Sequence, residues 1–405
     1  MNPTIELDEQ YCAHNYHPLP VVLVHGDGTY LWDDEGKNYL DMMSGCSAVN
    51  FGHAHPRLIK VLTEQAQGLA VVPRAYHTEL VPLFLEKMCL LTGQDQALAM
   101  NTGAEAVETA LKAARKWGYK VKGIARDQTE IIVCQGNSHG RTIATLGLSS
   151  EELYRDGFGP FPTGFKQIPY GDGAALENAI TPYTAAFLVE PIQGQAGVIV
   201  PSDEYLAECT RICQKHNVLL ICDEAQTGLG RTGRMLACEH EDVQPDGLIL
   251  GEALGGGLLP ISLFLAREDV MGVFTLGDHG STFGGNPLAA AVALEVIHVL
   301  GAERLPERAA KLGSNFLTKL RGLTSPFVKK VRGRGLLIGV EIDPAKATAR
   351  MVCEQLARHG ILTSETRKTV VRFTPPLTIT QDELDWAFKT IKKALAELEA
   401  VNNAA

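Results

Sequence analysis

The chain has 405 residues, of which 45% are hydrophobic and 21% are charged, as in ordinary globular proteins. Its formal net charge of −10 and its lack of a basic run make nucleic acid and anionic membrane surfaces poor partners. No long apolar run or signal-peptide pattern occurs near Met1, so we expect a cytoplasmic protein with no membrane partner.

The nine cysteines form no Cys-x-x-Cys pair. Cys209 and Cys213 are four residues apart on a predicted helix, and Cys238 directly precedes Glu239 and His240. A metal site at these residues is an alternative, but buried reduced thiols are typical of cytoplasmic chains. We therefore predict that the protein binds no metal.

The first 50 residues are predicted to form a small β-meander, centred on residues 30–41, followed by a loop. From residue 101 to residue 265, short apolar runs alternate with two segments of helical periodicity, residues 104–119 and 203–217. The apolar runs predict strands buried on both faces at residues 131–134, 186–190, 218–223, 247–251 and 261–265. Such alternation favours a mostly parallel sheet covered by helices, in which ligands bind at the carboxyl ends of the strands.

A second unit is predicted to begin near residue 324, with strands at residues 328–331, 336–342 and 370–373 and a helix at residues 347–359. Thr380 and Glu383 form a capping box that opens the last helix. We expect residues 1–50 and 324–405 to form one smaller α+β domain. Residues 51–323 are then the large α/β domain, which contains the pocket.

Two segments have the composition of an anion site. Residues 101–107, Asn-Thr-Gly-Ala-Glu-Ala-Val, follow an apolar run and open a helix, whose first N–H groups are free to bind an anion. Taken alone, an ordinary helix cap explains this segment equally well. Residues 279–287, His-Gly-Ser-Thr-Phe-Gly-Gly-Asn-Pro, are a second glycine-rich segment before a helix.

Charged residues at strand ends suggest a binding site. Asp223 ends a buried strand, where a carboxylate needs a cationic or hydrogen-bonding partner. Arg141 and Arg372 offer planar guanidinium groups, which suit carboxylates on geometric grounds. Both guanidinium groups are therefore candidates for binding a carboxylate.

These segments together resemble the class III aminotransferases of fold type I, and ornithine aminotransferases most closely, from residues 15–18 to residues 371–376. The resemblance implies a fold type I architecture with a mostly parallel central sheet and a pyridoxal phosphate pocket. It implies that Thr102, Gly103 and Ala104 form the phosphate cup, that Asp223 faces the ring nitrogen and that Gln226 faces the phenolic oxygen.

The resemblance also implies contacts beyond the cofactor ring. Thr282 would reach the phosphate bound by the neighbouring subunit, which implies a homodimer with shared active sites. Tyr16, Arg141 and Arg372 match positions that recognise the carboxylates of the substrate or gate that site, which implies a small, amino-acid-like substrate.

Five positions depart from the family pattern. The most important is Glu252, which stands where the family has the lysine whose amine forms an imine with the cofactor aldehyde. Ser138 and Ala225 stand where the family has an aromatic residue and a branched aliphatic residue on the two faces of the ring. Cys46 stands at a tyrosine position used in substrate recognition, and Gln195 replaces the glutamate that pairs with the arginine at position 372.

These departures suggest a pocket whose chemistry depends on acidic side chains. At about 5 Å and an effective dielectric near 20, the carboxylates of Glu252 and Asp223 would repel by roughly 3 kcal/mol, so we expect one to be protonated or neutralised. His139 and Ser138 could add a proton relay. Our main hypothesis is an enzyme without a covalent cofactor, in which Glu252 is the general acid or base and Asp223 its partner.

That hypothesis predicts a dehydration, cyclisation or hydrolysis in specialised amino-acid metabolism. Two alternatives remain. The first is a catalytically silent relative that binds a ligand or pairs with an active aminotransferase. The second, which the missing ring contacts disfavour, is an enzyme that holds pyridoxal phosphate or pyridoxamine phosphate noncovalently.

Overall fold

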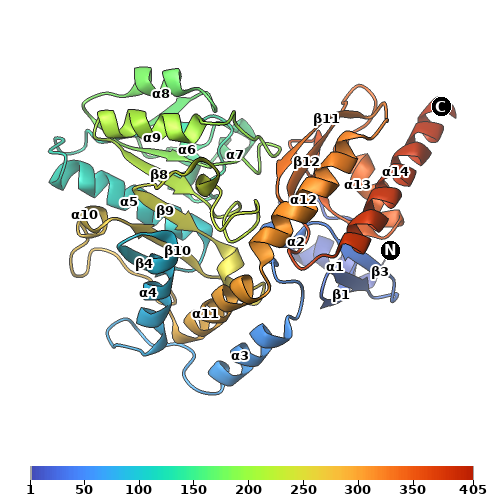
Figure 1. Ribbon diagram of the computed structural model, residues 1–405, viewed down its shortest axis with the longest axis horizontal. Coiled ribbons are helices and arrows are strands. Elements are labelled where there is room, and N and C mark those ends of the chain that lie inside the picture. Colours follow the sequence, from blue (N-terminus) through green and yellow to red (C-terminus); the bar gives the residue numbers. More distant parts are fainter. Residues whose placement is uncertain (1, 405) are drawn as a thin grey trace.

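The computed structural model describes residues 2–404, with the side chains of residues 2–400. Its centre is a seven-stranded sheet with the strand order β4-β10-β9-β8-β7-β5-β6, at the left of Figure 1. The strands, in chain order, are β4 (Gln96–Met100), β5 (Glu130–Cys134), β6 (Phe165–Ile168), β7 (Thr184–Val189), β8 (Leu219–Asp223), β9 (Gly247–Leu250) and β10 (Ser262–Ala266).

The central sheet is mostly parallel, as predicted. Strands β6, β5, β7, β8 and β9 run in one direction. Strand β10 is antiparallel to both β9 and β4. Its position was predicted but its direction was not, because a strand buried on both faces is an apolar run in either orientation.

Both faces of this sheet are buried. Along β5, Ile131 and Val133 pack into a hydrophobic cluster that includes residues of α5, while Ile132 and Cys134 pack into the larger cluster on the opposite face.

The helices of this part of the chain are α4 (Leu80–Thr92), α5 (Gly103–Lys120), α6 (Ile143–Leu148), α7 (Glu152–Arg155), α8 (Gly173–Ala179), α9 (Tyr205–Lys215), α10 (Glu268–Met271) and α11 (Pro287–Ala302), with 3-10 helices η1 (Cys238–Glu241) and η2 (Glu252–Gly255).

Two four-stranded sheets lie at the right of Figure 1. One has the order β1-β2-β3-β13 and consists of β1 (Leu23–Asp27), β2 (Tyr30–Asp33), β3 (Asn38–Asp41) and β13 (Ile361–Leu362). The other has the order β11-β12-β15-β14 and consists of β11 (Val328–Arg334), β12 (Leu337–Ile342), β14 (Ser364–Thr366) and β15 (Val370–Phe373). Because β13 pairs with β3, the two ends of the chain share a sheet. The domain boundaries at residues 50 and 323 stay predictions.

The remaining helices are α1 (Pro3–Tyr11), α2 (Ser44–Ser47), α3 (Pro56–Ala66), α12 (Leu305–Arg321), α13 (Ala349–Arg358) and α14 (Gln381–Ala404). The predicted capping box of α14 is present: Thr380 Oγ1 accepts the backbone N–H of Glu383, whose carboxylate accepts the N–H of Thr380. Helix α1 was not predicted from the sequence. None of its side chains is buried, so its sequence lacks the repeated apolar positions of a packed helix. No helix in the described part of the chain is long and apolar enough to span a membrane.

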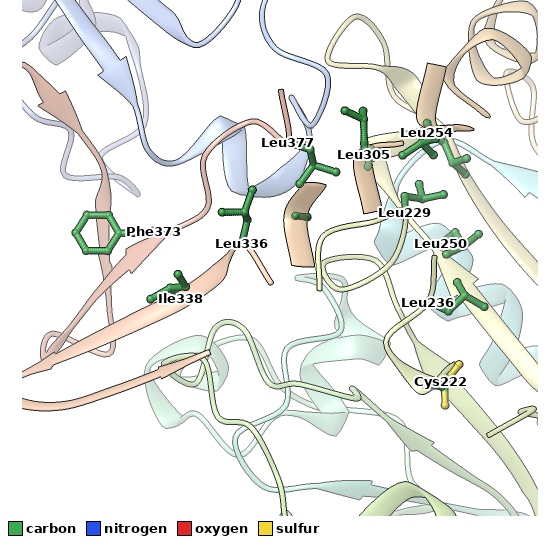
Figure 2. Packing of buried hydrophobic residues seen from close by; sticks show 14 of the residues in the cluster. Cys222, Leu229, Leu236, Leu250, Leu254, Leu305, Leu336, Ile338, Phe373 and Leu377 are labelled. Carbon is green, nitrogen blue, oxygen red and sulfur yellow. The ribbon is translucent and has the colours of Figure 1, made fainter. Parts of the chain in front are cut away.

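A continuous hydrophobic core joins the central sheet to the β11-β12-β15-β14 sheet. Figure 2 shows it running from Cys222 and Leu250 through Leu377 to Ile338 and Phe373. The core therefore holds the strand ends of the central sheet in a fixed position relative to β15, which carries Arg372.

A fully buried arginine, Arg231, crosses this junction. Its guanidinium donates to the carbonyl oxygens of Leu336 at 3.0 Å and Pro375 at 2.6 Å, and to the side chains of Ser44 and Asn50. Burial lowers the pKa of Arg231 to about 9. One side chain thus donates hydrogen bonds to four acceptors, which come from different parts of the chain.

Candidate active site

A cavity of about 220 Å³ lies where β5, β7, β8 and β9 end. Seven residues that the sequence predicted for the site line it: Gly103, Ala104, Ser138, His139, Asp223, Gln226 and Glu252. Ala225, identified as a departure from the family pattern, lines it too. These residues meet because the carboxyl ends of parallel strands share one edge of the sheet.

The N-terminus of α5 closes one side of the cavity through Gly103 and Ala104. Thr102 is exposed and acts as the N-cap, because its side chain accepts the N–H of Glu105, whose carboxylate accepts the N–H of Thr102 in return. This capping box fixes the first turn of the helix. Within residues 2–404, no acceptor bonds to the backbone N–H of Gly103 or Ala104.

Asp223 and His139 form a buried pair in the cavity wall. Nδ1 of His139 lies 2.7 Å from Oδ2 of Asp223, and Oδ1 of Asp223 accepts the N–H of Ala225 at 3.1 Å. Burial alone lowers the pKa of His139, but the hydrogen bond and charge of Asp223, together with the charge of Glu190, raise it above its ordinary value. Nε2 of His139 is buried and has no partner among the described residues.

Glu190 belongs to the cavity and was not predicted as a site residue. It follows β7 directly, lines the cavity, and its Oε2 accepts the backbone N–H of Ser138 at 3.0 Å. Burial raises the pKa of Glu190 to about 8; nearby His139 lowers it and Asp223 raises it further. The signal was available in the sequence, since Glu190 ends a predicted buried strand just as Asp223 does.

Glu252 follows β9 and begins η2, with its side chain in the cavity. Burial raises the pKa of Glu252; its own backbone N–H lowers it, the charge of Asp223 raises it and that of Arg372 lowers it. The direction agrees with the repulsion expected between the two carboxylates. No lysine is among the described residues that line the cavity.

Arg372 lies on β15 and is 3% exposed, outside the cavity wall. Its Nη2 lies 3.0 Å from Sγ of Cys46, and its Nε has no partner among the described residues. The backbone carbonyl oxygen of Gln195 accepts a hydrogen bond from the hydroxyl group of Thr366. No hydrogen bond joins the described side chains of Gln195 and Arg372. Arg372 is therefore not neutralised by a carboxylate at position 195.

Three other predicted residues lie apart from the cavity wall. Arg141 is exposed and stacks over Tyr154 at 3.7 Å, with its Nη1 3.4 Å from Oγ of Ser138. Tyr16 is 84% exposed and Thr282 is also exposed. The role expected of Thr282 concerns a neighbouring subunit, so it stays a prediction.

Residues 11–395 match the model of the family described as aminotransferase class-III. The chain belongs to this family. It is 55% identical over 392 residues to the ornithine aminotransferase of Geobacillus sp. (strain WCH70), an alignment that covers 97% of this chain and 98% of that protein. It is also 52% identical over 391 residues to the ornithine aminotransferase of Bacillus subtilis (strain 168), covering 96% and 97% of the two chains.

A solved structure of an ornithine aminotransferase, from Toxoplasma gondii, superposes with a TM-score of 0.97 at 46% identity, over 99% of this chain and 95% of that one. The fold type I architecture expected from the sequence is thereby confirmed. The Toxoplasma gondii structure has PLP at partial occupancy at its active site. That finding contradicts our expectation of a pocket that works without a cofactor, and the hypothesis of catalysis by acidic side chains alone is dropped with it.

Proposed function

We propose that this class-III aminotransferase family member is an ornithine-aminotransferase-like protein that holds pyridoxal phosphate or pyridoxamine phosphate noncovalently. The observation that carries the proposal is the composition of the cavity. It joins a helix N-terminus to the Asp223–His139 pair, and it is lined by Glu252 with no lysine among its described lining residues. Since a carboxylate cannot bond to an aldehyde as an amine does, noncovalent contacts must hold the cofactor.

The helix end suits the phosphate of such a cofactor. The N–H groups of Gly103 and Ala104 have no acceptor within the described part of the chain, and the N-terminus of a helix as long as α5 favours an anion. A Cβ atom on Gly103 would lie 3.8 Å from Cβ of Ala225 and 3.9 Å from Oε2 of Glu252. Glycine therefore leaves open the space between the helix end and the opposite wall.

The Asp223–His139 pair suits the pyridine nitrogen. A carboxylate at a buried strand end accepts a hydrogen bond from a protonated ring nitrogen, and His139 holds that carboxylate in one orientation. The buried, unpartnered Nε2 of His139 leaves one polar group of the wall available to a ligand. Gln226 adds an amide that can contact a phenolic oxygen.

When bound, the cofactor supplies the electron sink that amino-group transfer requires. Glu252 is placed to hold or release a proton at its carboxyl oxygens, since burial raises its pKa toward the range useful in general acid–base catalysis.

The proposed substrate is a small amino acid, in line with relatives named ornithine aminotransferases. Arg372 supports this choice, because a buried guanidinium with a free Nε suits a carboxylate. Arg141, beside Ser138 at the edge of the cavity, is placed for a second carboxylate. We further propose a homodimer in which the exposed Thr282 of one subunit completes the phosphate site of the other; size-exclusion chromatography with light scattering tests it.

Cofactor binding tests the main proposal. Purified protein titrated with pyridoxal phosphate should bind it saturably and keep the absorbance of the free aldehyde. Treatment with borohydride followed by mass spectrometry should find no fixed adduct. The Asp223→Asn variant should bind at least about tenfold more weakly, because a charged hydrogen bond is lost, whereas Glu86→Gln, an exposed change on α4, should bind normally.

Two results contradict the proposal: failure of both cofactor forms to bind, and a lysine of the native protein found covalently joined to pyridoxal phosphate. Amino-group transfer from ornithine to a keto acid distinguishes an enzyme from a silent binder. Turnover that is lost in Glu252→Gln supports the enzyme. Saturable binding without any turnover identifies a protein that binds the cofactor only.

A further inference from the structure

The carboxylate of Glu252 has no cationic partner among the described residues. Within residues 2–400 it forms no ion pair, and no side chain of another residue donates a hydrogen bond to it. Arg372 is the cation whose charge reaches Glu252, but its Nη2 is bound to Cys46. Because removal from water raises the pKa of a carboxyl group that has no cation beside it, a cation placed next to Glu252 would favour its ionised form.

The rest of the cavity does not supply that group. Its lining contains the carboxyl groups of Glu190, Asp223 and Glu252 against the single imidazole of His139, with no lysine or arginine among the described lining residues. His139 is already paired with Asp223. In the ligand-free protein a proton can balance Glu252, because burial raises the pKa of this carboxyl group. A ligand that brings a cation can take the place of that proton.

From these positions we infer that the pocket selects the amine form of the cofactor, pyridoxamine phosphate, whose ammonium group pairs with Glu252. This inference rests on the proposed noncovalent binding of the cofactor. Glu252 lies across the space next to Gly103, so a ligand with its phosphate at the N-terminus of α5 can direct a short cationic arm toward the carboxylate.

The two cofactor forms differ in what they offer Glu252. The ammonium group of pyridoxamine phosphate donates hydrogen bonds and carries a positive charge, whereas the aldehyde oxygen of pyridoxal phosphate only accepts. Facing the aldehyde, Glu252 can keep its proton and donate to the aldehyde oxygen, but that hydrogen bond joins two neutral groups and is the weaker of the two. A hydrogen bond between two charged groups predicts a preference of roughly tenfold to a hundredfold for the amine form.

Equilibrium dissociation constants test the inference without any need for turnover. Isothermal titration of the full-length protein should be run with pyridoxamine phosphate, pyridoxal phosphate and pyridoxine phosphate, which carries a neutral hydroxymethyl group on the same ring and phosphate. We expect pyridoxamine phosphate to bind at least about tenfold more tightly than either other form. In Glu252→Gln the preference should shrink to within about threefold, while Glu86→Gln should keep it in full.

The outcomes separate this inference from the proposed function. If pyridoxal phosphate binds noncovalently and as tightly as pyridoxamine phosphate, the inference fails and the proposed function stands. If neither binds, both fail. Should Glu252→Gln not fold, Glu252→Asp keeps the charge on a shorter arm, so retention of at least part of the preference supports the inference and its complete loss opposes it.

Discussion

Replacing Glu190 by glutamine should change how the stability of the ligand-free protein depends on pH. Glu190 is buried behind β7, and its carboxyl oxygen accepts the N–H of Ser138. Glutamine has nearly the same shape and can still accept that hydrogen bond through its amide oxygen, but it has no proton to release. The substitution therefore isolates the titration of this one carboxyl group.

The direction of this pH dependence follows from the raised pKa of Glu190. Burial lifts the pKa of Glu190 from 4.5 to about 8 in the folded protein, so between these values the folded state keeps a proton that the unfolded state releases. The contribution of Glu190 to stability is complete below pH 4.5 and is lost as the pH rises through about 8. At 1.36 kcal/mol for each pKa unit, the loss is at most about 5 kcal/mol.

Urea unfolding at intervals from pH 5 to pH 9 measures this effect. The difference in unfolding free energy between Glu190→Gln and the unmodified protein should be small at pH 5 and should grow by several kcal/mol in favour of the variant by pH 9. Glu86→Gln, which changes an exposed carboxylate, should show no such trend. A difference that stays flat over the whole range would refute the conclusion that Glu190 holds a buried proton.

Three further predictions concern other parts of the molecule. Arg231→Met should lower the unfolding free energy by roughly 3–5 kcal/mol, measured by urea unfolding, because it leaves buried acceptors on several segments without a donor. Thr102→Val, which removes the N-cap acceptor of α5, should cost about 1 kcal/mol in the same assay. Glu252→Lys alone should give weak transamination with added pyridoxal phosphate, because Ser138 and Ala225 leave both ring faces with small side chains; adding Ser138→Phe and Ala225→Val should raise the rate at least about tenfold.

The location of the site could be predicted from the sequence because it follows from strand ends. Buried strands appear as short apolar runs, and the polar residues that follow them must gather at one edge of a parallel sheet. Asp223, His139 and Glu252 were placed together on that basis and on the family pattern, and all three line the cavity. The direction of β10 could not be predicted, because its apolar run is the same in either orientation.

Distances between side chains were less predictable. Arg141 was grouped with Arg372 because guanidinium groups bind carboxylates. In the structure, however, Arg141 is exposed and stacks over Tyr154, whereas Arg372 is buried beside Cys46. The position of Arg141 depends on loop conformation, which follows no periodic pattern in the sequence. Glu190 was missed for a different reason: like Asp223 it ends a predicted strand, but the family pattern assigned a role to Asp223 and none to Glu190.

The presence of Glu190, Asp223 and Glu252 in the lining of one cavity links stability to binding. Each carboxyl group that is taken from water without a cation lowers the stability of the ligand-free protein or raises the pKa of the group. A ligand that brings a positive charge to Glu252 removes part of that cost, so the gain appears as affinity for the ligand. Under our proposal, Glu252 therefore has two effects: it rules out a covalent bond to the cofactor aldehyde, and it favours binding of the amine form.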